Sequence, residues 1–304
     1  MKNQASTAFM MATLSILVWS FAGAVSRGLA EGLGTFTAGA LPNFLGAIVL
    51  MLYKAKTVGL GGFRDTPRGY WLGCGLTFVS FSVFVTLSIG LAQTREQVVI
   101  SGLFRGIWPL LALILSIPLQ KKRVKKWFIM SASISFIGMV LANFADGFAP
   151  SAFAGSLAIL WLVSFLALLS SVAWALYSIF VGKYVANPVH NHLWVLLLAT
   201  GVIQIALAVA FGETPQFGLG QLGGILYLGI GAGFIVNLCW IRVMQGPYSH
   251  TALLFFNFFP IFSTIAVGLT LGVRLTLPLM IGAVLVAVGT LWSRRCFVGD
   301  AWVE

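Results

Sequence analysis

Long apolar runs alternate with short polar connections along the whole chain. A helix needs about 20 mostly apolar residues to cross a lipid bilayer, and ten runs have this character. The pattern therefore predicts an all-α membrane protein with ten transmembrane helices and almost no soluble part. The runs cover roughly residues 8–26, 34–53, 69–92, 98–119, 125–143, 153–182, 193–211, 220–243, 250–272 and 276–294.

Composition agrees with this pattern. The chain is 59% hydrophobic and only 8% charged, whereas soluble domains carry about 25% charged residues. A net charge of +11 does not indicate nucleic acid, because the basic residues occupy short gaps between apolar runs rather than one aromatic-rich face. The expected surroundings are a lipid bilayer, with a small-molecule substrate as the other partner; the oligomeric state is not readable.

The distribution of basic residues predicts the orientation. Counted from a cytoplasmic N-terminus, all but four of the 18 Lys and Arg residues fall on the cytoplasmic side. Arg27, Arg95 and Arg274 fall on the other side, and Arg105 lies inside the fourth run. Because cytoplasmic loops carry the excess of Lys and Arg, both termini are expected in the cytoplasm.

The first run has a second interpretation as a signal peptide. Lys2 precedes it, and Ala22-Gly23-Ala24 resembles a small-residue cleavage site. However, the run is longer than a usual signal core. The two halves of the chain also resemble each other, and this run serves as the first helix of the first half. We therefore expect it to be the first span.

The two halves of the chain can be aligned with each other. Near the start of each half, Trp19 corresponds to Trp174. Because each half holds five predicted helices, the second repeat (148–304) must be inverted relative to the first (1–147), and the two form one transmembrane domain. At a constant offset in the second part of each half, the matching pairs are Pro109 and Pro260, Arg123 and Arg274, and Gly138 and Gly289.

Inverted repeats are typical of transporters, which bind substrate near the bilayer midplane between the halves and rock one half against the other. A proline inside a spanning helix removes one backbone hydrogen bond and bends the helix. Pro109 and Pro260 are therefore predicted as hinges beside the cavity; ordinary tolerated kinks are the alternative.

Residues for enzymatic chemistry are sparse. The seven carboxylates are expected in loops or at the C-terminus, and the chain has no HExxH, CxxC pair, phosphate-binding glycine loop or GxSxG motif. We expect no enzyme activity, no cofactor and no metal. A membrane-embedded enzyme is the alternative from another functional class.

Arg105 is the unusual residue of the fourth run. Ser101, Arg105 and Trp108 share one helix face, while Gly102 and Gly106 lie on the adjacent side. An arginine in the middle of a span costs roughly 2.5 to 3.5 kcal/mol, so it should face a wet cavity or a partner. Either it holds a substrate carboxylate, or it reaches outward towards Glu96.

Further polar and aromatic residues fall near the middle of predicted spans. Aromatic rings offer flat apolar walls and cation–π faces, although each one is also explained by packing, and Trp240 by an interfacial aromatic belt. With Arg105, the candidate substrate-binding residues are Trp19, Ser20, Asn43, Phe78, Ser82, Trp108, Trp174, Tyr177, Asn237, Trp240 and Asn257.

Four stretches resemble a known family. They are VWSFAGAVSRGLAEGLG, RGYWLGCGLTFVS, IWP and CWIRVMQGPYSHTALLFF, and they resemble the EamA-type branch of the drug/metabolite transporter superfamily, in particular its bacterial aromatic amino-acid exporters. The resemblance covers essentially the whole chain. It implies ten helices in a two-fold inverted basket in the bacterial inner membrane. It also implies a cavity lined by the first, third, fourth, sixth, eighth and ninth helices.

The same resemblance implies a secondary transporter that exports aromatic and other neutral amino acids from the cytoplasm by alternating access. Two positions depart from the family's aromatic exporters. Phe81-Ser82 stands where they carry Tyr-Glu, and Gly106, preceded by Arg105, stands where they carry tyrosine. A multidrug or organic-cation exporter of the same fold is the alternative, but Arg105 would repel a cation.

Overall fold

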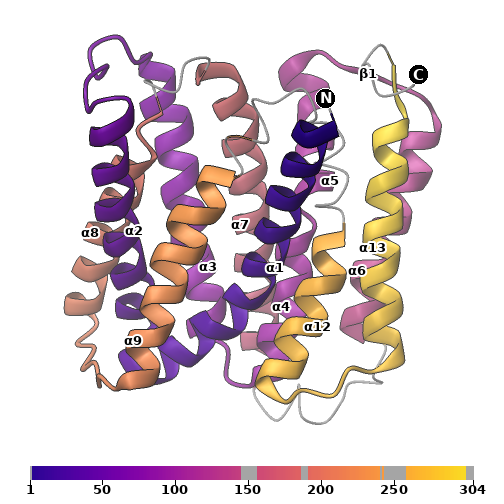
Figure 1. Cartoon of the computed structure of the whole chain (residues 1–304). Helices are drawn as coiled ribbons and strands as arrows, with labels where there is room; N and C mark the ends of the chain where they lie inside the picture. Colours follow the sequence, from indigo (N-terminus) through magenta and orange to yellow (C-terminus); the bar gives the residue numbers. More distant parts are fainter. Residues whose placement is uncertain (1, 145–155, 186–190, 240–241, 243–257, 299–304) are drawn as a thin grey trace.

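A computed structural model of the chain describes residues 2–144, 156–185, 191–239, 242 and 258–298. Helices make up nearly all of this part (Figure 1). Two short strands, β1 (Arg123–Val124) and β2 (Phe297–Val298), pair antiparallel. The helices are α1 (Lys2–Leu33), α2 (Thr35–Thr57), η1 (Tyr70–Gly75), α3 (Leu76–Gly90), α4 (Arg95–Gly106), α5 (Trp108–Gln120), α6 (Trp127–Phe144), α7 (Leu157–Tyr184), α8 (Leu193–Ala210), α9 (Leu219–Leu226), η3 (Tyr227–Val236), α12 (Phe259–Leu271) and α13 (Leu277–Arg295).

Every predicted apolar run coincides with helical structure in the described residues. Within the described ranges, eight segments are long and apolar enough to cross a membrane, and the shorter apolar helices Trp127–Leu141 and Ile261–Leu271 accompany them. The prediction of a multi-pass, all-α protein is confirmed. The first part of the run 250–272 lies outside the described residues.

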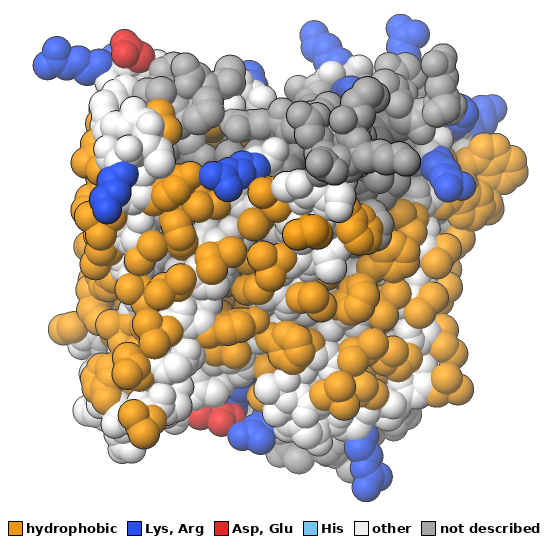
Figure 2. All heavy atoms as spheres, viewed as in Figure 1, with side chains coloured by type: hydrophobic (Ala, Val, Ile, Leu, Met, Phe, Trp, Pro, Cys, Tyr) orange, Lys and Arg blue, Asp and Glu red, His pale blue; other side chains and the backbone are white. Residues whose placement is uncertain are grey.

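The surface has the polarity of a membrane protein. Figure 2 shows hydrophobic side chains over the broad middle of the molecule, with Lys and Arg near its upper and lower edges. Exposed residues such as Leu72, Ile129 and Val209 are about three-quarters accessible. Large apolar side chains at such exposure are stable in lipid rather than in water.

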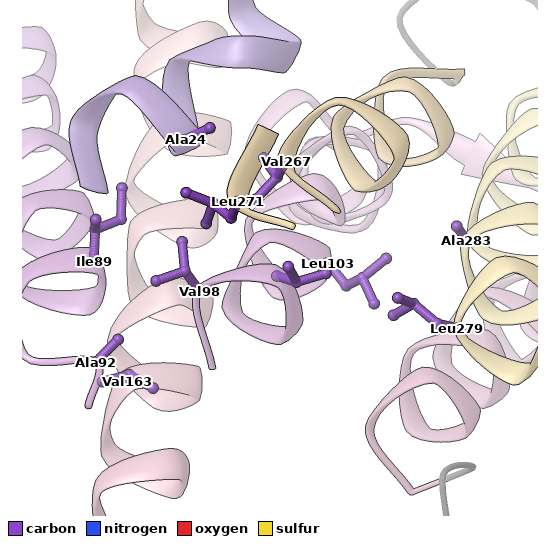
Figure 3. Close-up of a cluster of buried hydrophobic side chains, with 11 residues drawn as sticks. Ala24, Ile89, Ala92, Val98, Leu103, Val163, Val267, Leu271, Leu279 and Ala283 are labelled. Atoms are coloured by element: carbon purple, nitrogen blue, oxygen red, sulfur yellow. The ribbon is translucent and has the colours of Figure 1, made fainter. Parts of the chain in front are cut away.

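Helix α4 lies inside the bundle, where buried side chains of both halves meet. Val98 and Leu103 of α4 belong to a cluster that α1, α3, α7, α12 and α13 complete (Figure 3). Because both residues are fully buried, packing fixes the rotation of α4 about its axis. The position of Arg105, at the end of this helix, is thereby fixed as well.

The fourth predicted span is interrupted next to Pro109, the proline that was expected in the middle of a helix. Helix α4 ends at Gly106, and α5 begins at Trp108 with Pro109 in its first turn, where a missing N–H costs nothing. Pro109 cannot donate to the carbonyl of Arg105 four residues earlier. Ser171 of α7 replaces that bond: its hydroxyl lies 2.8 Å from the Arg105 carbonyl oxygen and 2.7 Å from that of Phe104.

Helices α5 and α12 have matching ends. Each is 13 residues long with a proline in the first turn, so Pro260 takes the same place in α12 as Pro109 in α5. Each ends at a residue in the left-handed conformation, Lys121 with φ 54° and Gly272 with φ 70°. The correspondence between the halves therefore extends from sequence to helix boundaries and caps.

Helices α6 and α13, side by side at one edge of the molecule (Figure 1), meet through reciprocal close contacts. A Cβ atom placed on Gly138 would lie 2.7 Å from the Gly282 carbonyl oxygen and 2.9 Å from the Val286 nitrogen. One placed on Gly289 would lie 2.7 Å from the Ser131 oxygen and 2.6 Å from the Ser135 nitrogen. The later part of α6 thus meets the earlier part of α13, and the later part of α13 meets the earlier part of α6. The two helices therefore run antiparallel.

The third and eighth spans both contain π-helical turns, a form that is rare and often found at functional sites. Segment η1 precedes α3, and η3 follows α9; each begins at a tyrosine, Tyr70 and Tyr227. In η3 the glycines allow close approach to α2, where a Cβ on Gly46 would lie 3.1 Å from the Gly229 carbonyl oxygen.

Candidate substrate-binding cavity

A cavity of about 250 Å³ lies between helices of both halves. Its walls come from α1, α2, α3, α4, α5, α7, η3 and α12, with Leu197 from α8. Helix α2, which the family resemblance had left out of the lining, contributes Gly39, Pro42 and Asn43. The predicted residues found in the lining are Trp19, Asn43, Phe78, Ser82, Arg105, Trp108, Trp174 and Asn237.

Arg105 faces this cavity and makes no ion pair among the described residues, so the alternative contact with Glu96 is wrong in this structure. Its guanidinium packs against two glycines: a Cβ on Gly23 would lie 3.1 Å from Nη2, and one on Gly102 would lie 3.5 Å from it. Its Nε atom is buried without a hydrogen-bond partner in the described part of the chain. The lining thus contains a cation with unused donors.

Trp174 of α7 is the centre of an aromatic wall. Trp19 and Trp108 meet it edge-on, with ring centroids 5.8 Å and 6.4 Å away. Phe81 and Phe78 lie 4.5 Å and 6.4 Å from it at tilted angles. Edge-to-face and tilted pairs are the favourable aromatic geometries, and these five rings all line the cavity. The wall can hold an apolar or aromatic group.

A hydrogen-bonded polar cluster forms another part of the lining. The Asn43 side-chain nitrogen lies 3.0 Å from the Gly39 carbonyl oxygen, 3.0 Å from Gln204 Oε1 and 3.3 Å from Ser82 Oγ. Gln204 Nε2 in turn donates to Thr86 Oγ1 at 2.8 Å. Ser82 and Thr86 also line the cavity, whereas Gln204 stands behind them, fully buried.

Four predicted site residues lie elsewhere. Ser20 is buried and donates to the Ile16 carbonyl oxygen at 2.6 Å, so it satisfies its own helix. Tyr177 is packed behind the aromatic wall, with its ring 5.1 Å from Trp174 and 5.2 Å from Phe78. Trp240 and Asn257 lie outside the described residues.

Other lining residues were not predicted, although spacing offered a signal for some. Ser26 lies seven residues after Trp19, and Thr86 lies four residues after Ser82, each on the same helix face as its partner. Gln204, which stands behind the lining, was detectable as a single amide in an apolar run. Further lining residues missed by the prediction are Ser170, Ser171, Phe259 and Ser263.

Comparison with known proteins assigns the chain to a family. The model of the EamA-like transporter family matches the chain twice, over residues 6–144 and 161–295. The chain belongs to the EamA-like transporter family. The two matches show a tandem repeat of the family's unit, and they cover most of the chain.

Two curated relatives in the family are each named aromatic amino acid exporter YddG. The one from Salmonella typhimurium (strain 14028s / SGSC 2262) is 28% identical over 297 residues, which is 96% of this chain and 97% of the relative. The one from Escherichia coli (strain K12) is 25% identical over 289 residues, covering 93% and 95%.

The fold of this chain also matches a protein whose crystal structure is known. The TM-score is 0.69 at 21% sequence identity, over 95% of this chain and 98% of the other. At that identity the likeness shows the fold alone.

Proposed function

We propose that this protein is a secondary transporter of the bacterial inner membrane that exports amino acids, aromatic and other neutral ones, from the cytoplasm by alternating access. The observation that carries the proposal is Arg105, a cation with unused donors, in a cavity walled by three tryptophans. The guanidinium would bind the substrate carboxylate, and the aromatic wall would hold its side chain. The names of the two curated relatives support the substrate class.

The alternating-access mechanism is supported by the relation between the halves. Antiparallel α6 and α13 occupy matching positions in the two repeats, as a second repeat of inverted topology requires. Pro109 and Pro260 each begin a helix at matching positions, and the interruption at Pro109 adjoins the cavity through Trp108. Pro109 and Pro260 are the proposed hinges.

The proposed orientation places both termini in the cytoplasm. Helix α1 begins, and α13 ends, at the same edge of the molecule as β1 (Figure 1). That edge carries the basic stretch from Lys121 to Lys126 and the pair Arg294 and Arg295. An excess of positive charge of this kind marks the cytoplasmic side.

The cavity favours amino acids over bulky cations for two reasons. Its volume of about 250 Å³ is below the roughly 300–1,000 Å³ of sites for drug-sized molecules. Its one described ionisable lining residue, Arg105, is positive. A permanent cation would therefore be repelled, whereas a zwitterion offers a carboxylate.

Counterflow in proteoliposomes tests the proposal. Vesicles loaded with unlabelled amino acid are followed for entry of labelled phenylalanine, threonine and methionine, with a quaternary ammonium as the competing class. We expect amino-acid counterflow in the wild type and its loss in Arg105→Leu. Arg274→Leu is the matched control, because Arg274 is exposed on a loop away from the cavity.

The outcomes separate the alternatives. Unchanged amino-acid counterflow in Arg105→Leu would remove the carboxylate role of Arg105. Transport of the quaternary ammonium alone would instead assign the protein to multidrug or organic-cation export.

A further inference from the structure

Arg105 accounts for only one end of a zwitterion. An amino acid that enters the cavity must also place its α-ammonium group, which has three hydrogen-bond donors and no acceptor. No Asp or Glu lines the cavity in the described part of the chain. The ammonium must therefore be held by neutral groups. The aromatic rings of the lining can offer it a cation–π face, but only hydrogen-bond acceptors satisfy its three N–H donors, and leaving such a donor unpaired in a partly dry site is costly.

A backbone carbonyl sets the direction of the Asn43 amide. The amide nitrogen lies 3.0 Å from the Gly39 carbonyl oxygen, one helical turn earlier. A carbonyl group can only accept, so Asn43 must turn its NH₂ group, and not its oxygen, towards Gly39. The second amide hydrogen is then available for Gln204 Oε1, also at 3.0 Å. Both donors of Asn43 are engaged inside the protein.

The acceptor of Asn43 is left over. None of the described residues donates a hydrogen bond to Asn43 Oδ1, and Asn43 lines the cavity. Two further cavity-lining oxygens belong to the same cluster, Ser82 Oγ and Thr86 Oγ1. Each hydroxyl oxygen has two acceptor lone pairs, so the cluster has free acceptor capacity at three atoms.

Gln204 propagates this direction. Because its Oε1 faces Asn43, its Nε2 must face Thr86, to which it donates at 2.8 Å. Gly39 leaves the space for this arrangement: a Cβ there would lie 2.6 Å from Thr86 Oγ1 and 2.8 Å from Gln204 Nε2. Gln204 is fully buried and does not line the cavity, so it can act on a ligand only through its neighbours.

We infer that Asn43, Ser82 and Thr86 form a subsite for the α-ammonium group of the substrate, and that Gln204 is the positioning residue that keeps the Asn43 oxygen directed to the cavity. This inference rests on the proposed function and adds to it the site that binds the α-ammonium group of the substrate. Arg105 selects a carboxylate, and this cluster selects an ammonium, so together they select an amino acid over the corresponding carboxylic acid.

Asn237 is the competing amide in the cavity. Its nitrogen also donates to two backbone carbonyls, those of Ala232 and Gly233, each at 3.0 Å. However, its lining neighbours on the same span, Leu228, Ala232 and Gly233, offer no side-chain acceptor. It can therefore supply one acceptor where an ammonium needs about three, which makes Asn237→Leu the matched control for Asn43→Leu.

Equilibrium binding to the purified protein in detergent tests the subsite, read by the fluorescence of the cavity tryptophans. The ligands are phenylalanine and 3-phenylpropanoate, which has the same ring and carboxylate but no ammonium. We expect wild type to bind phenylalanine about 10- to 100-fold more tightly, the range for hydrogen bonds to a charged group. In Asn43→Leu and Gln204→Leu this ratio should fall towards one, with the affinity for 3-phenylpropanoate unchanged.

Two comparison variants make the result specific. Asn237 lines the cavity, so Asn237→Leu can weaken both ligands alike, but it should keep their wild-type ratio. Gln204→Glu should keep or raise the ratio, because a glutamate still accepts from the Asn43 nitrogen and, when ionised, adds a negative charge behind the subsite. Unchanged binding of 3-phenylpropanoate shows that a variant is folded. A ratio lost in Asn237→Leu and kept in Asn43→Leu would overturn the inference.

The inference and the proposed function fail differently. If wild type binds phenylalanine and 3-phenylpropanoate equally, the ammonium subsite is wrong while amino-acid export stands. If wild type binds no amino acid, including threonine and methionine, the proposed function fails and the subsite fails with it.

Discussion

Replacing Gly289 with alanine should destabilise the protein, although alanine is normally the better helix residue. A methyl group at this position would lie 2.6 Å from the Ser135 nitrogen and 2.7 Å from the Ser131 carbonyl oxygen. Both atoms belong to the backbone of α6, which cannot move aside without separating two packed helices. The substitution must therefore push α6 and α13 apart.

The magnitude follows from two opposing effects. Gly to Ala inside a helix gains roughly 1 kcal/mol from backbone entropy, and overpacking a close contact costs typically about 1–3 kcal/mol, occasionally more. Because the contact is backbone against backbone, we take the upper part of the overpacking range, about 2–3 kcal/mol, which leaves a net loss of about 1–2 kcal/mol after the gain of roughly 1 kcal/mol. Gly138→Ala should behave alike, since it meets the backbone of α13 in the reciprocal way.

Thermal unfolding in detergent measures the effect. The control is Gly28→Ala, an exposed position inside α1 where an added Cβ meets nothing within 4 Å. Gly28→Ala should leave the unfolding temperature unchanged or raise it, whereas Gly289→Ala should lower it. Equal behaviour of the two variants would refute the close antiparallel packing of α6 on α13.

Three further predictions concern other sites. Gly23→Ala brings a methyl group against the Arg105 guanidinium, 3.1 Å away, and should raise the KM of amino-acid counterflow several-fold with little change in unfolding temperature; an unchanged KM would contradict the placement of Arg105. Glu213→Ala removes the carboxylate that accepts from the first backbone amides of α2 at 2.8 Å, so it should cost about 1–2 kcal/mol of stability, and an unaltered unfolding temperature would contradict that cap. Lys121→Gly relieves a left-handed residue with φ 54° and should raise stability by up to about 1 kcal/mol; a fall in unfolding temperature would show that the Lys121 side chain contributes more than the strain costs.

The spans were predictable because lipid leaves the backbone few choices. Each spanning segment must satisfy its own hydrogen bonds, so long apolar runs become helices. Proline at 109 also marked an interruption. The sequence could not show which residue would bond to the backbone carbonyl that Pro109 leaves free. In the structure the hydroxyl of Ser171, on another helix and far along the chain, donates to the Arg105 carbonyl oxygen.

The candidate site was predictable to the extent that burial of polar groups is expensive. Arg105 and Asn43 stand out in apolar runs for this reason, and both line the cavity. Ser20 stood out equally, yet its hydroxyl donates to a carbonyl of its own helix. The residue type alone does not tell whether a serine bonds within its helix or faces a cavity. Gln204 acts from behind the cavity wall, through contacts between α2, α3 and α8. Such contacts between distant segments depend on the packed bundle and not on any one helix.

The contact between α6 and α13 has a consequence for how the chain assembles. In a two-fold symmetric dimer, each contact between the two subunits occurs twice, because the same residues meet from both sides. The contacts of Gly138 with α13 and of Gly289 with α6 repeat each other in this way. Here a single chain provides both sides, and the pairing of β1 with β2 lies next to it. Contacts that let the halves recognise each other are thus present on their own surfaces. Two polypeptides that each carry one half are expected to find each other in the membrane and reconstitute the bundle.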